Sequence, residues 1–340
     1  MAAPNSVLST TLQILRDKLV DNSYLAHPLF RALEQAGNIK KVSGGARIDQ
    51  PVIFGDHSSL TDLTNGFEPV SLAVTDPFRQ AQFEWSNFTQ PVILSDVERL
   101  ANKGDLAVVN ILESKMKNVM LSLKKSVSRK VLVGDSGPTA LQTLNGTGTS
   151  AVAADTTGWF QTAAFGSQAT NTVGGLSKST FAAQNWQNQV YDSSGTFALS
   201  HLDQLMINAQ LYNPAGIMPS IILMSPSCYG AFMALQQSYV QYVDQAGRDS
   251  LDKDMVGMWR GAKIYVDPNL GFTNAAADKV SAYVLSPDTF ELYVDTDGDF
   301  NVSDLIPVPG TATLMSRVLV RTQLVTGHLA SHGILINAEA

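Results

Sequence analysis

The strongest periodic pattern in the chain is helical and lies between residues 105 and 132. Apolar residues recur there every three or four positions, which places them on one face of a helix. At about 1.5 Å per residue, the segment predicts a helix on the order of 40 Å long. Ser95 and Glu98 match a capping box, in which each side chain accepts a hydrogen bond from the other residue's backbone amide. The apolar positions are Leu106, Val109, Leu112, Met116, Met120, Leu123, Val127 and Val131.

Ahead of this helix the pattern changes to the alternation that is typical of β-strands. Apolar and polar residues alternate in ARIDQPVIFG, residues 46–55, and again in AQFEWSNF, residues 81–88, which predicts two strands. The stretch between them, residues 56–77, consists mostly of turn-forming residues and is long for a connection inside a compact domain. We therefore expect a long hairpin that projects from the body of the protein.

The remaining segments predict short helices near the N-terminus and a mixed α/β region toward the C-terminus. Residues 6–37 have helical spacing that is interrupted at Pro28, because proline disfavours helical geometry in the residue before it. Residues 134–197, rich in Gly, Ser, Thr and Ala, predict loops and short strands. Residues 313–338 alternate over long stretches and predict two long strands. Between these regions we expect helices at 201–212 and 226–242, and strands at 220–226, 261–268, 281–287 and 291–294.

Composition indicates a surface with few charges. The chain has 23 basic and 30 acidic residues, a formal net charge of −7, and only 16% charged residues, where soluble proteins average roughly 25%. The negative balance argues against a strongly basic nucleic-acid binder. An uncharged surface suits a subunit that buries it against copies of itself, although it also fits a monomer. The longest apolar run has five residues, Ala231 to Leu235, against the roughly 18 that a membrane span needs, so we expect no membrane partner.

The sequence contains no complete catalytic motif, and we expect neither an enzyme nor a bound cofactor. Ser122 and Lys125 have the S-x-x-K spacing of acylating enzymes, but they lie inside the long predicted helix without the partner motifs. Cys228 is the only cysteine, which excludes an intrachain disulfide and a cysteine-rich zinc site. An enzyme of unrecognised family, a hydrolase or lyase, stays an alternative, with its site in residues 134–197. That region offers few titratable groups: Asp135, Asp155, Lys178 and Asp192.

Two further groups resemble ligand sites but are better interpreted as structure. Asp295–Asp304, DTDGDFNVSD, is rich in the oxygen ligands that calcium prefers, but its glycine and its acids do not have the spacing of a calcium loop. Asp297-Gly298 instead predicts a hairpin turn; a calcium-dependent adhesive module is the alternative. His328 and His332 lie in a segment that looks extended, which would place them more than about 12 Å apart, so we interpret them as ordinary packed or exposed histidines.

Positive charge gathers on the long predicted helix of this acidic chain. Such a cluster is usually a solvated face or a set of partners for acidic neighbours, but nucleic-acid binding also requires clustered charge. Both interpretations stay open. The candidates for facing a polyanion are Lys117, Lys124, Lys125 and Arg129, and Lys115 and Lys130 complete the cluster.

The order of the predicted elements resembles that of the major capsid proteins of tailed phages, which have the Hong Kong 97-like fold. A helical N-terminus, a long hairpin, a capping box, a long helix, a glycine-rich segment, an α/β unit and a C-terminal sheet follow one another as in that family. The resemblance covers nearly the whole chain. Four stretches are also similar to the family: GGARIDQPVIFG (44–55), FRQAQFEWSNFTQPVILSDVE (78–98), GGLSKSTFAAQNW (174–186) and QLVTGHLASHGILINA (323–338).

The resemblance implies an α+β fold with four parts. Residues 1–39 would form an N-terminal helical arm, and residues 40–94 an extended β-hairpin loop that overlaps a neighbouring subunit. Residues 95–197 together with 312–340 would form a peripheral domain, with the long helix as its spine and a long sheet. Residues 198–311 would form an α/β axial domain, which meets its copies around five-fold and six-fold centres.

The resemblance also implies a structural function in a virion. The subunit would self-assemble through hexamers and pentamers into an icosahedral shell around double-stranded DNA, which it would contact non-specifically. A portal, a scaffolding protein and decoration or cement proteins would be partners, and assembly would take place in the host cytoplasm. Because the first expected helix begins near residue 6, we expect any scaffold to be a separate protein. An encapsulin-like shell is a close alternative.

Subunit contacts are expected on the hairpin and its base. A charge at Phe54, for example in Phe54→Asp, is expected to block shell closure without unfolding the subunit. Some shells of this family are welded by isopeptide bonds from a lysine of the extended loop to an asparagine of a neighbour. No lysine occurs between Lys41 and Lys103, so we expect no such crosslink. The expected contact residues are Phe54, Phe67, Phe78 and Trp85.

Overall fold

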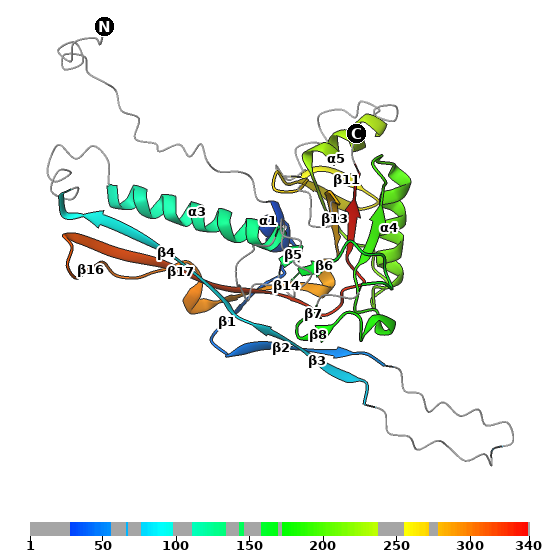
Figure 1. The fold of residues 1–340 in the computed structure, drawn as a ribbon, viewed down its shortest axis with the longest axis horizontal. Helices are drawn as coiled ribbons and strands as arrows, with labels where there is room; N and C mark the ends of the chain where they lie inside the picture. Colours follow the sequence, from blue (N-terminus) through cyan, green and yellow to red (C-terminus); the bar gives the residue numbers. More distant parts are fainter. Residues whose placement is uncertain are drawn as a thin grey trace, which may run out of the picture. The chain divides into compact units, whose positions relative to one another are not determined.

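The computed structural model is a mixed α+β protein (Figure 1). It describes residues 28–55, 66, 76–97, 111–133, 143–145, 158–168, 172–236, 255–271 and 278–338. These residues fall into two compact units. The larger unit contains those within 25–88, 126–299 and 320–340, and the smaller unit contains those within 89–125 and 300–319. Three elements continue from one unit into the other: β4 (Ser86–Ser95), α3 (Ile111–Val133) and β17 (Thr313–Thr326).

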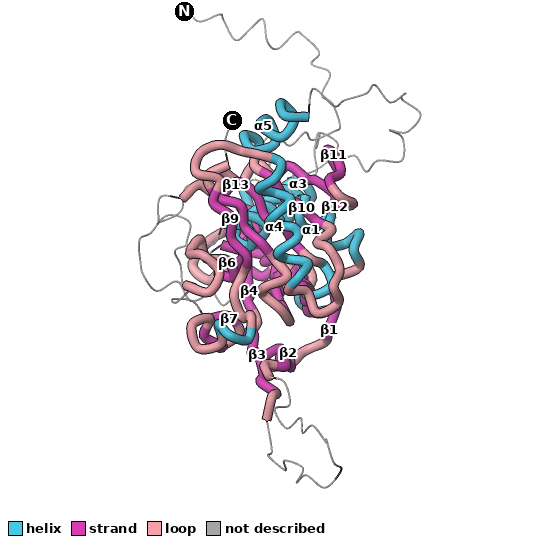
Figure 2. Tube along the Cα trace, turned by 90° about the vertical axis from the view of Figure 1, so that its right-hand side faces the viewer, coloured by secondary structure: helices cyan, strands magenta, loops and turns pink. Residues whose placement is uncertain are grey.

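A mixed sheet in the order β11-β12-β10-β13-β18-β9 lies at the centre of the larger unit. Its strands β10 and β12 are parallel, as are β18 and β9, whereas the other neighbours are antiparallel. Figure 2 labels β9, β13, β10 and β12 of this sheet, in which β18 lies between β13 and β9. The strands are β9 (Gln189–Asp192), β10 (Ile221–Met224), β11 (Met255–Trp259), β12 (Ala262–Val266), β13 (Val280–Leu285) and β18 (Gly333–Ile336).

Helices α4 (Leu199–Leu211) and α5 (Pro226–Gln236) pack against this sheet. Side chains alternate between the two faces of a strand. Accordingly, Ile222 of β10 lies in a core with α4 and α5, whereas Leu223 belongs to a second core. Burial on both faces explains the uninterrupted apolar sequence of β10. Helix α4 approaches β18 so closely that a Cβ atom on Gly333 would lie 2.7 Å from Cδ1 of Leu205.

The second core of the larger unit includes an N-terminal helix and two further strands. Helix α1 (Pro28–Ala36) buries Leu29 and Leu33 completely. Strand β1 (Ile39–Val42) then pairs in parallel with β14 (Phe290–Asp295). Strand β14 pairs antiparallel with residues 322–326 of β17. The helix between residues 28 and 36 confirms part of the predicted N-terminal helical region; residues 6–27 lie outside the described residues.

The glycine-rich region contains the predicted short strands and, in addition, a short 3-10 helix. Its aromatic residues belong to the core, because Trp159, Phe160 and Trp186 are buried. The elements are β5 (Thr143–Asn145), β6 (Gly158–Phe160), β7 (Thr172–Val173), β8 (Leu176–Ser177) and the 3-10 helix η1 (Ala182–Gln184).

In the smaller unit, two short strands pair with the first part of β17. Strand β15 (Asn301–Val302) and strand β16 (Ile306–Pro307) are both antiparallel to it. Helix α3 is joined to β4 by two side-chain hydrogen bonds. Nζ of Lys115 donates to the carbonyl of Ile93 over 3.3 Å, and Nε2 of Gln90 donates to Oγ of Ser122 over 3.5 Å.

The long helix is confirmed as far as the structure describes it. Helix α3 covers 23 residues, and residues 105–110 of the prediction lie outside the described residues. Before the helix, the backbone N–H of Val97 donates to Oγ of Ser95 over 3.3 Å. The second member of the predicted capping box, Glu98, is not among the described residues. No helix in the described part of the chain is both long and apolar enough to span a membrane.

Two predictions for the C-terminal third are corrected. Strand β17 has 14 residues, but β18 has only four and joins the other sheet. The stretch between them, residues 327–332, is a turn rather than extended chain. Asp297 and Gly298 do lie in a turn, the 3-10 helix η4 (Thr296–Gly298). This turn does not close a two-residue hairpin, because β14 and β15 both pair with β17 instead of with each other.

Candidate subunit interface

The hairpin of β2 (Arg47–Ile53) and β3 (Phe78–Glu84) has one inner and one outer face. The two strands are antiparallel. On the inner face Ile48 lies opposite Phe83, and Phe83 and Ala81 are buried. The outer face is polar near the base of the hairpin and apolar at the far end of the two strands. Its cross-strand pairs are, in that order, Arg47–Glu84, Asp49–Gln82, Pro51–Gln80 and Ile53–Phe78.

Ile53 and Phe78 form an exposed apolar pair at the far end of β2 and β3. Their exposed fractions are 68% and 61%. Side chains directly opposite each other on two strands have Cβ atoms about 4.5–5.5 Å apart, so the two form one continuous patch. Full burial of such a side chain contributes roughly 1.5–3 kcal/mol. The pair is therefore suited to contact another protein surface.

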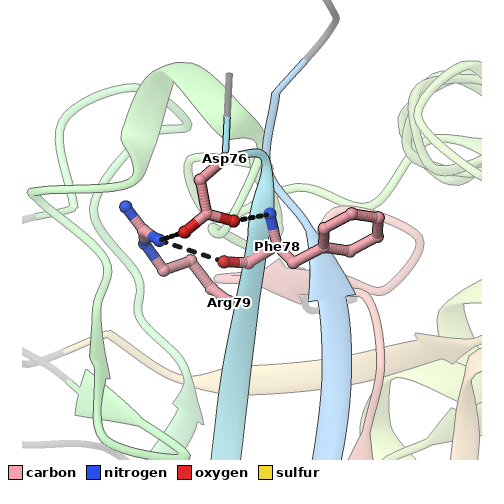
Figure 3. Close-up of polar contacts among 3 residues, drawn as sticks. All are labelled: Asp76, Phe78 and Arg79. Atoms are coloured by element: carbon pink, nitrogen blue, oxygen red, sulfur yellow. Dashed lines mark hydrogen bonds and ion pairs between the residues drawn. The ribbon is translucent and has the colours of Figure 1, made fainter. Parts of the chain in front are cut away.

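A small polar network holds the backbone beside Phe78 (Figure 3). The carboxylate of Asp76 accepts hydrogen bonds from the backbone N–H of Phe78 and from Nη1 of Arg79, both over 3.4 Å. Nη1 of Arg79 also donates to the carbonyl of Phe78 over 3.0 Å. Figure 3 shows the ring of Phe78 pointing away from these polar groups. Asp76 and Arg79 thus orient the backbone while the ring stays free.

Two of the residues predicted to contact a neighbour pack inside their own chain instead. The ring of Phe54 lies 4.7 Å from the ring of Phe181 and 5.3 Å from that of Trp186, measured between centroids. Trp85 is buried, with 7% of its surface exposed. Because Phe54 is half-buried, a charge there would face these two aromatic rings. Phe67 lies outside the described residues.

Arg321 fastens the base of the hairpin to the strands below it. Its guanidinium carbon lies 4.8 Å from the ring centroid of Trp85. Nη1 donates to Oδ2 of Asp295 and Nη2 donates to the carbonyl of Gly45, each over 2.7 Å. Because side chains alternate along β17, Arg321 lies on the other face of the strand from the buried residues Val318 and Val320. The groups that Arg321 contacts are distant in sequence. Sequence analysis therefore missed this residue.

Gly174 fixes the middle of β3 to the glycine-rich region. Its carbonyl accepts the backbone N–H of Gln82 over 2.8 Å. Its φ of +57° favours glycine, and a Cβ atom would lie 2.8 Å from Cβ of Ala81. With Arg321 at the base, this contact holds the hairpin to its own chain as far as β3 extends.

Some cations of the basic helix contact neighbouring groups. Nζ of Lys124 lies 5.2 Å from the ring centroid of Phe300, within cation–π distance. Nζ of Lys130 lies 5.6 Å from the ring centroid of Phe88. Lys117, Lys124 and Arg129 are exposed, whereas Lys125 is half-buried. Part of the charge therefore packs on the chain's own rings and part faces solvent, and both interpretations of the cluster stay open.

The acidic turn has internal partners for its carboxylates. Asp295 pairs with Arg321, and its Oδ1 accepts the backbone N–H of Asp297 over 3.1 Å. Asp299 pairs with Lys41 over 2.6 Å, and this hydrogen bond raises the pKa of Lys41. Among the described residues, no group of three or more His, Cys, Asp or Glu side chains could hold a metal ion.

Of the residues considered for an enzyme, the structure describes Lys178 and Asp192, and each has its own structural partners. Lys178 is fully buried, and its Nζ donates to the carbonyl of Trp159, to Oε1 of Gln168 over 3.3 Å and to Oδ1 of Asn188 over 3.1 Å. Burial lowers the pKa of Lys178 to about 7. Asp192 is exposed and accepts the backbone N–H of Ser194. Asp135 and Asp155 lie outside the described residues.

Comparison with known proteins identifies the fold. Searches of protein-family models and of curated proteins found no match. Among solved structures, the capsid of the native GTA particle matches with a TM-score of 0.63 at 11% identity, over 99% of this chain and 100% of that one. The capsid of cyanophage A-1(L) matches with a TM-score of 0.63 at 16% identity, over 97% of both chains.

A bacterial shell protein has the same architecture. The SrpI encapsulin from Synechococcus elongatus PCC 7942 matches with a TM-score of 0.56 at 10% identity, over 100% of this chain and 96% of that one. These three matches cover 97–100% of this chain, as the resemblance in the order of the elements predicted. At these identities the similarity establishes the fold alone. This chain therefore has the fold of the tailed-phage major capsid proteins.

Proposed function

We propose that this protein is the major capsid protein of a tailed phage, the repeated subunit of an icosahedral shell. The observation that carries the proposal is the end-to-end match, in both directions, with shell proteins of several sources. An enzyme that had borrowed part of this fold would be expected to carry additional or missing segments and a cluster of reactive side chains. Among the described residues, the groups considered for such a cluster have structural partners instead.

In this proposal, residues 40–94 form the extended loop that overlaps a neighbouring subunit. The exposed pair of Ile53 and Phe78 supports this assignment, because it is an apolar patch that the described part of the chain leaves exposed. Phe67 stays a proposed contact. Residues 95–197 with 312–340 form the peripheral domain, and residues 198–311 the axial domain that meets its copies in hexamers and pentamers.

The proposed cargo is double-stranded DNA, bound without sequence preference. A net charge of −7 disfavours general attraction to DNA, so any contact must come from local positive charge. The exposed residues Lys117, Lys124 and Arg129 of α3, with Lys125, are the proposed DNA-facing groups. Because the shell only has to enclose the DNA, a few weak phosphate contacts are sufficient.

The proposal includes partners and excludes one kind of crosslink. A portal, a separate scaffolding protein and decoration proteins would act with the shell, which would assemble in the host cytoplasm and reside in the virion. The absence of lysine between Lys41 and Lys103 supports a shell held by burial rather than by lysine–asparagine bonds. Denaturing gels of mature particles are therefore expected to show this chain as a single band, and a ladder of multiples would contradict this part.

Negative-stain electron microscopy with light-scattering mass tests the proposal directly. The purified chain, alone or with a co-expressed scaffold, is expected to give closed shells, pentamers or hexamers. A stable monomer or dimer under both conditions would overturn it.

An encapsulin-like shell is the second candidate, and the match to the SrpI encapsulin favours it specifically. The two functions predict different contents. Particles from the native source would contain double-stranded DNA if the chain is a phage capsid protein, and a protein cargo if it is an encapsulin. Nuclease-resistant nucleic acid, measured by absorbance and gel after capsid disruption, separates the two.

A further inference from the structure

The turn between β17 and β18 is held by a buried histidine whose hydrogen bonds require a neutral ring. His332 is completely buried. Its Nδ1 lies 3.2 Å from the backbone nitrogen of Ser286, and its Nε2 lies 3.2 Å from Oγ1 of Thr289. Ser286 precedes the 3-10 helix η3 (Pro287–Thr289) and Thr289 is its last residue, so the imidazole connects that helix to the turn.

The direction of one hydrogen bond determines the protonation state of His332. A backbone N–H is always a donor, so Nδ1 must accept from Ser286 and cannot carry a proton. The proton therefore sits on Nε2, which can donate to Thr289. That hydroxyl in turn lies 2.7 Å from Oγ of Ser331. An imidazolium has N–H groups at both positions, so protonation would set two N–H groups against each other and break the bond to Ser286.

His332 packs among aromatic rings, which carry no carboxylate that could pair with a positively charged imidazole. The rings of Trp159, Phe160 and Phe290 lie 6.0, 6.4 and 6.0 Å away between centroids. Burial, with the nearby His328, lowers the pKa of His332 to about 3. Burial also lowers the pKa of His328 to about 4.

The other titratable groups near the turn are directed elsewhere. Asp288 of η3 and Glu291 of β14 line a pocket of about 200 Å³ together with His328, and Glu291 pairs with Lys40. Lys178 donates a hydrogen bond to the backbone carbonyl of Trp159. Tyr283 of β13 stacks on Phe160. Ser286 and Thr289 contact the ring of His332 through neutral groups, a backbone amide and a hydroxyl.

We propose that His332 is an acid-sensitive latch built into the fold. While neutral, it holds the β17–β18 turn against η3; when protonated, it releases the amide of Ser286 and the turn opens locally. The latch is fully closed above the ordinary histidine pKa of about 6.5. It is lost progressively as the pH falls below that value, because the opened turn binds a proton more tightly than the closed one. This inference does not depend on the proposed capsid function.

Hydrogen–deuterium exchange by mass spectrometry tests the latch on the full-length protein. Between pH 7 and pH 4, protection in peptides covering 278–292 and 326–338 is expected to fall, after correction for the intrinsic pH dependence of exchange. With a closed-state pKa of about 3, the opening equilibrium is expected to rise on the order of 100-fold by pH 4. Peptides of β10 and α4 are expected to keep their protection. A uniform loss across all peptides would overturn the proposal.

The variant His332→Asn separates the latch from general acid sensitivity. The asparagine Oδ1 can accept the N–H of Ser286 but cannot be protonated in this range, so the pH-dependent loss in the two peptides is expected to shrink to the part that His328, whose pKa burial lowers to about 4, contributes. His201→Asn is the matched control, because Nδ1 of His201 faces the hydroxyl of Ser193, which can serve as donor or acceptor. This control is expected to behave as the wild type. If the pH-dependent loss of protection in the two peptides were the same in His332→Asn as in the wild type, the proposal would be overturned.

Should His332→Asn fail to fold, the wild-type protein gives a second test. Nitrogen-15 NMR of histidine-labelled protein distinguishes a protonated from an unprotonated ring nitrogen, and substitution of the other four histidines one at a time assigns the signals. The signal of His332 is expected to show an unprotonated Nδ1 and a protonated Nε2 from pH 7 to pH 5. A protonated Nδ1 at pH 7 would overturn the proposal.

Discussion

The guanidinium of Arg321 stacks on the indole of Trp85, with 4.8 Å between the guanidinium carbon and the ring centroid. The same guanidinium binds the carboxylate of Asp295 and the carbonyl of Gly45. One side chain thus connects both ends of the hairpin, since Gly45 precedes β2 and Trp85 follows β3. These contacts of Arg321 hold the two strands together at the base of the hairpin.

We predict that Arg321→Gln destabilises the subunit by roughly 2–4 kcal/mol, because it leaves the buried carboxylate of Asp295 without its cation and removes the contact with Trp85. Arg321→Lys keeps the charge but not the planar fork and is expected to cost less. Urea unfolding followed by fluorescence measures both. Arg317→Gln, at an exposed position of the same strand, is the control. An equal loss of stability in this variant would contradict the proposed role of Arg321.

We predict that Gly174→Ala destabilises the subunit by roughly 1–3 kcal/mol, since the new Cβ atom would lie 2.8 Å from Cβ of Ala81. Gly175→Ala is a close control. Gly175 also has a positive φ, of +75°, but a Cβ atom there would meet nothing within 4 Å. Thermal unfolding of the two variants therefore separates the hairpin contact from backbone strain. Equal shifts in Tm would show that the contact with β3 is unimportant.

We predict that charges at Phe78 and Phe54 have different effects. Phe78→Asp is expected to leave the Tm of the unassembled subunit nearly unchanged and to block shell formation, because this ring is exposed on the outer face. Phe54→Asp is expected to destabilise the subunit itself by roughly 2–4 kcal/mol, because the carboxylate would be placed against Phe181 and Trp186.

Light scattering and electron microscopy measure assembly in these variants, and calorimetry measures the stability of the subunit. Gln80→Asp is the matched control for the added charge, because Gln80 lies on the same outer face at a polar position. It is expected to assemble. Normal shells from Phe78→Asp would remove Phe78 from the proposed interface.

We predict that the stability difference between wild type and Lys178→Met depends on pH. The folded-state pKa of Lys178 is lowered to about 7, so between about pH 7 and pH 10.5 the unfolded chain binds more protons than the folded one. The free energy of unfolding of the wild type should therefore rise with pH relative to the variant, by up to about 1.4 kcal/mol per pH unit. Urea unfolding at pH 7 and pH 9.5 checks the sign. A difference that is constant with pH would show that Lys178 does not titrate in this window.

Periodicity predicted the long helix and the hairpin strands, because each of these elements presents a repeating face to a core. An uninterrupted apolar run predicted strand β10, which is buried on both faces. Phe78 was predicted as a contact and is exposed. Phe54 and Trp85 were predicted in the same way but are packed inside the chain, since an aromatic residue on a strand has the same sequence pattern whether its cover comes from its own chain or from another.

The amino-acid sequence by itself determined the order and type of the elements, the shortage of surface charge, and through them the capsid fold. Only the tertiary structure decided which side chains meet across long sequence separations, such as Arg321 with Trp85, Gly174 with Ala81, and His332 with Ser286. It also decided that residues 327–332 turn instead of continuing a strand. The physical reason is that periodicity depends on neighbours a few residues away, whereas these contacts depend on how separate elements pack against one another.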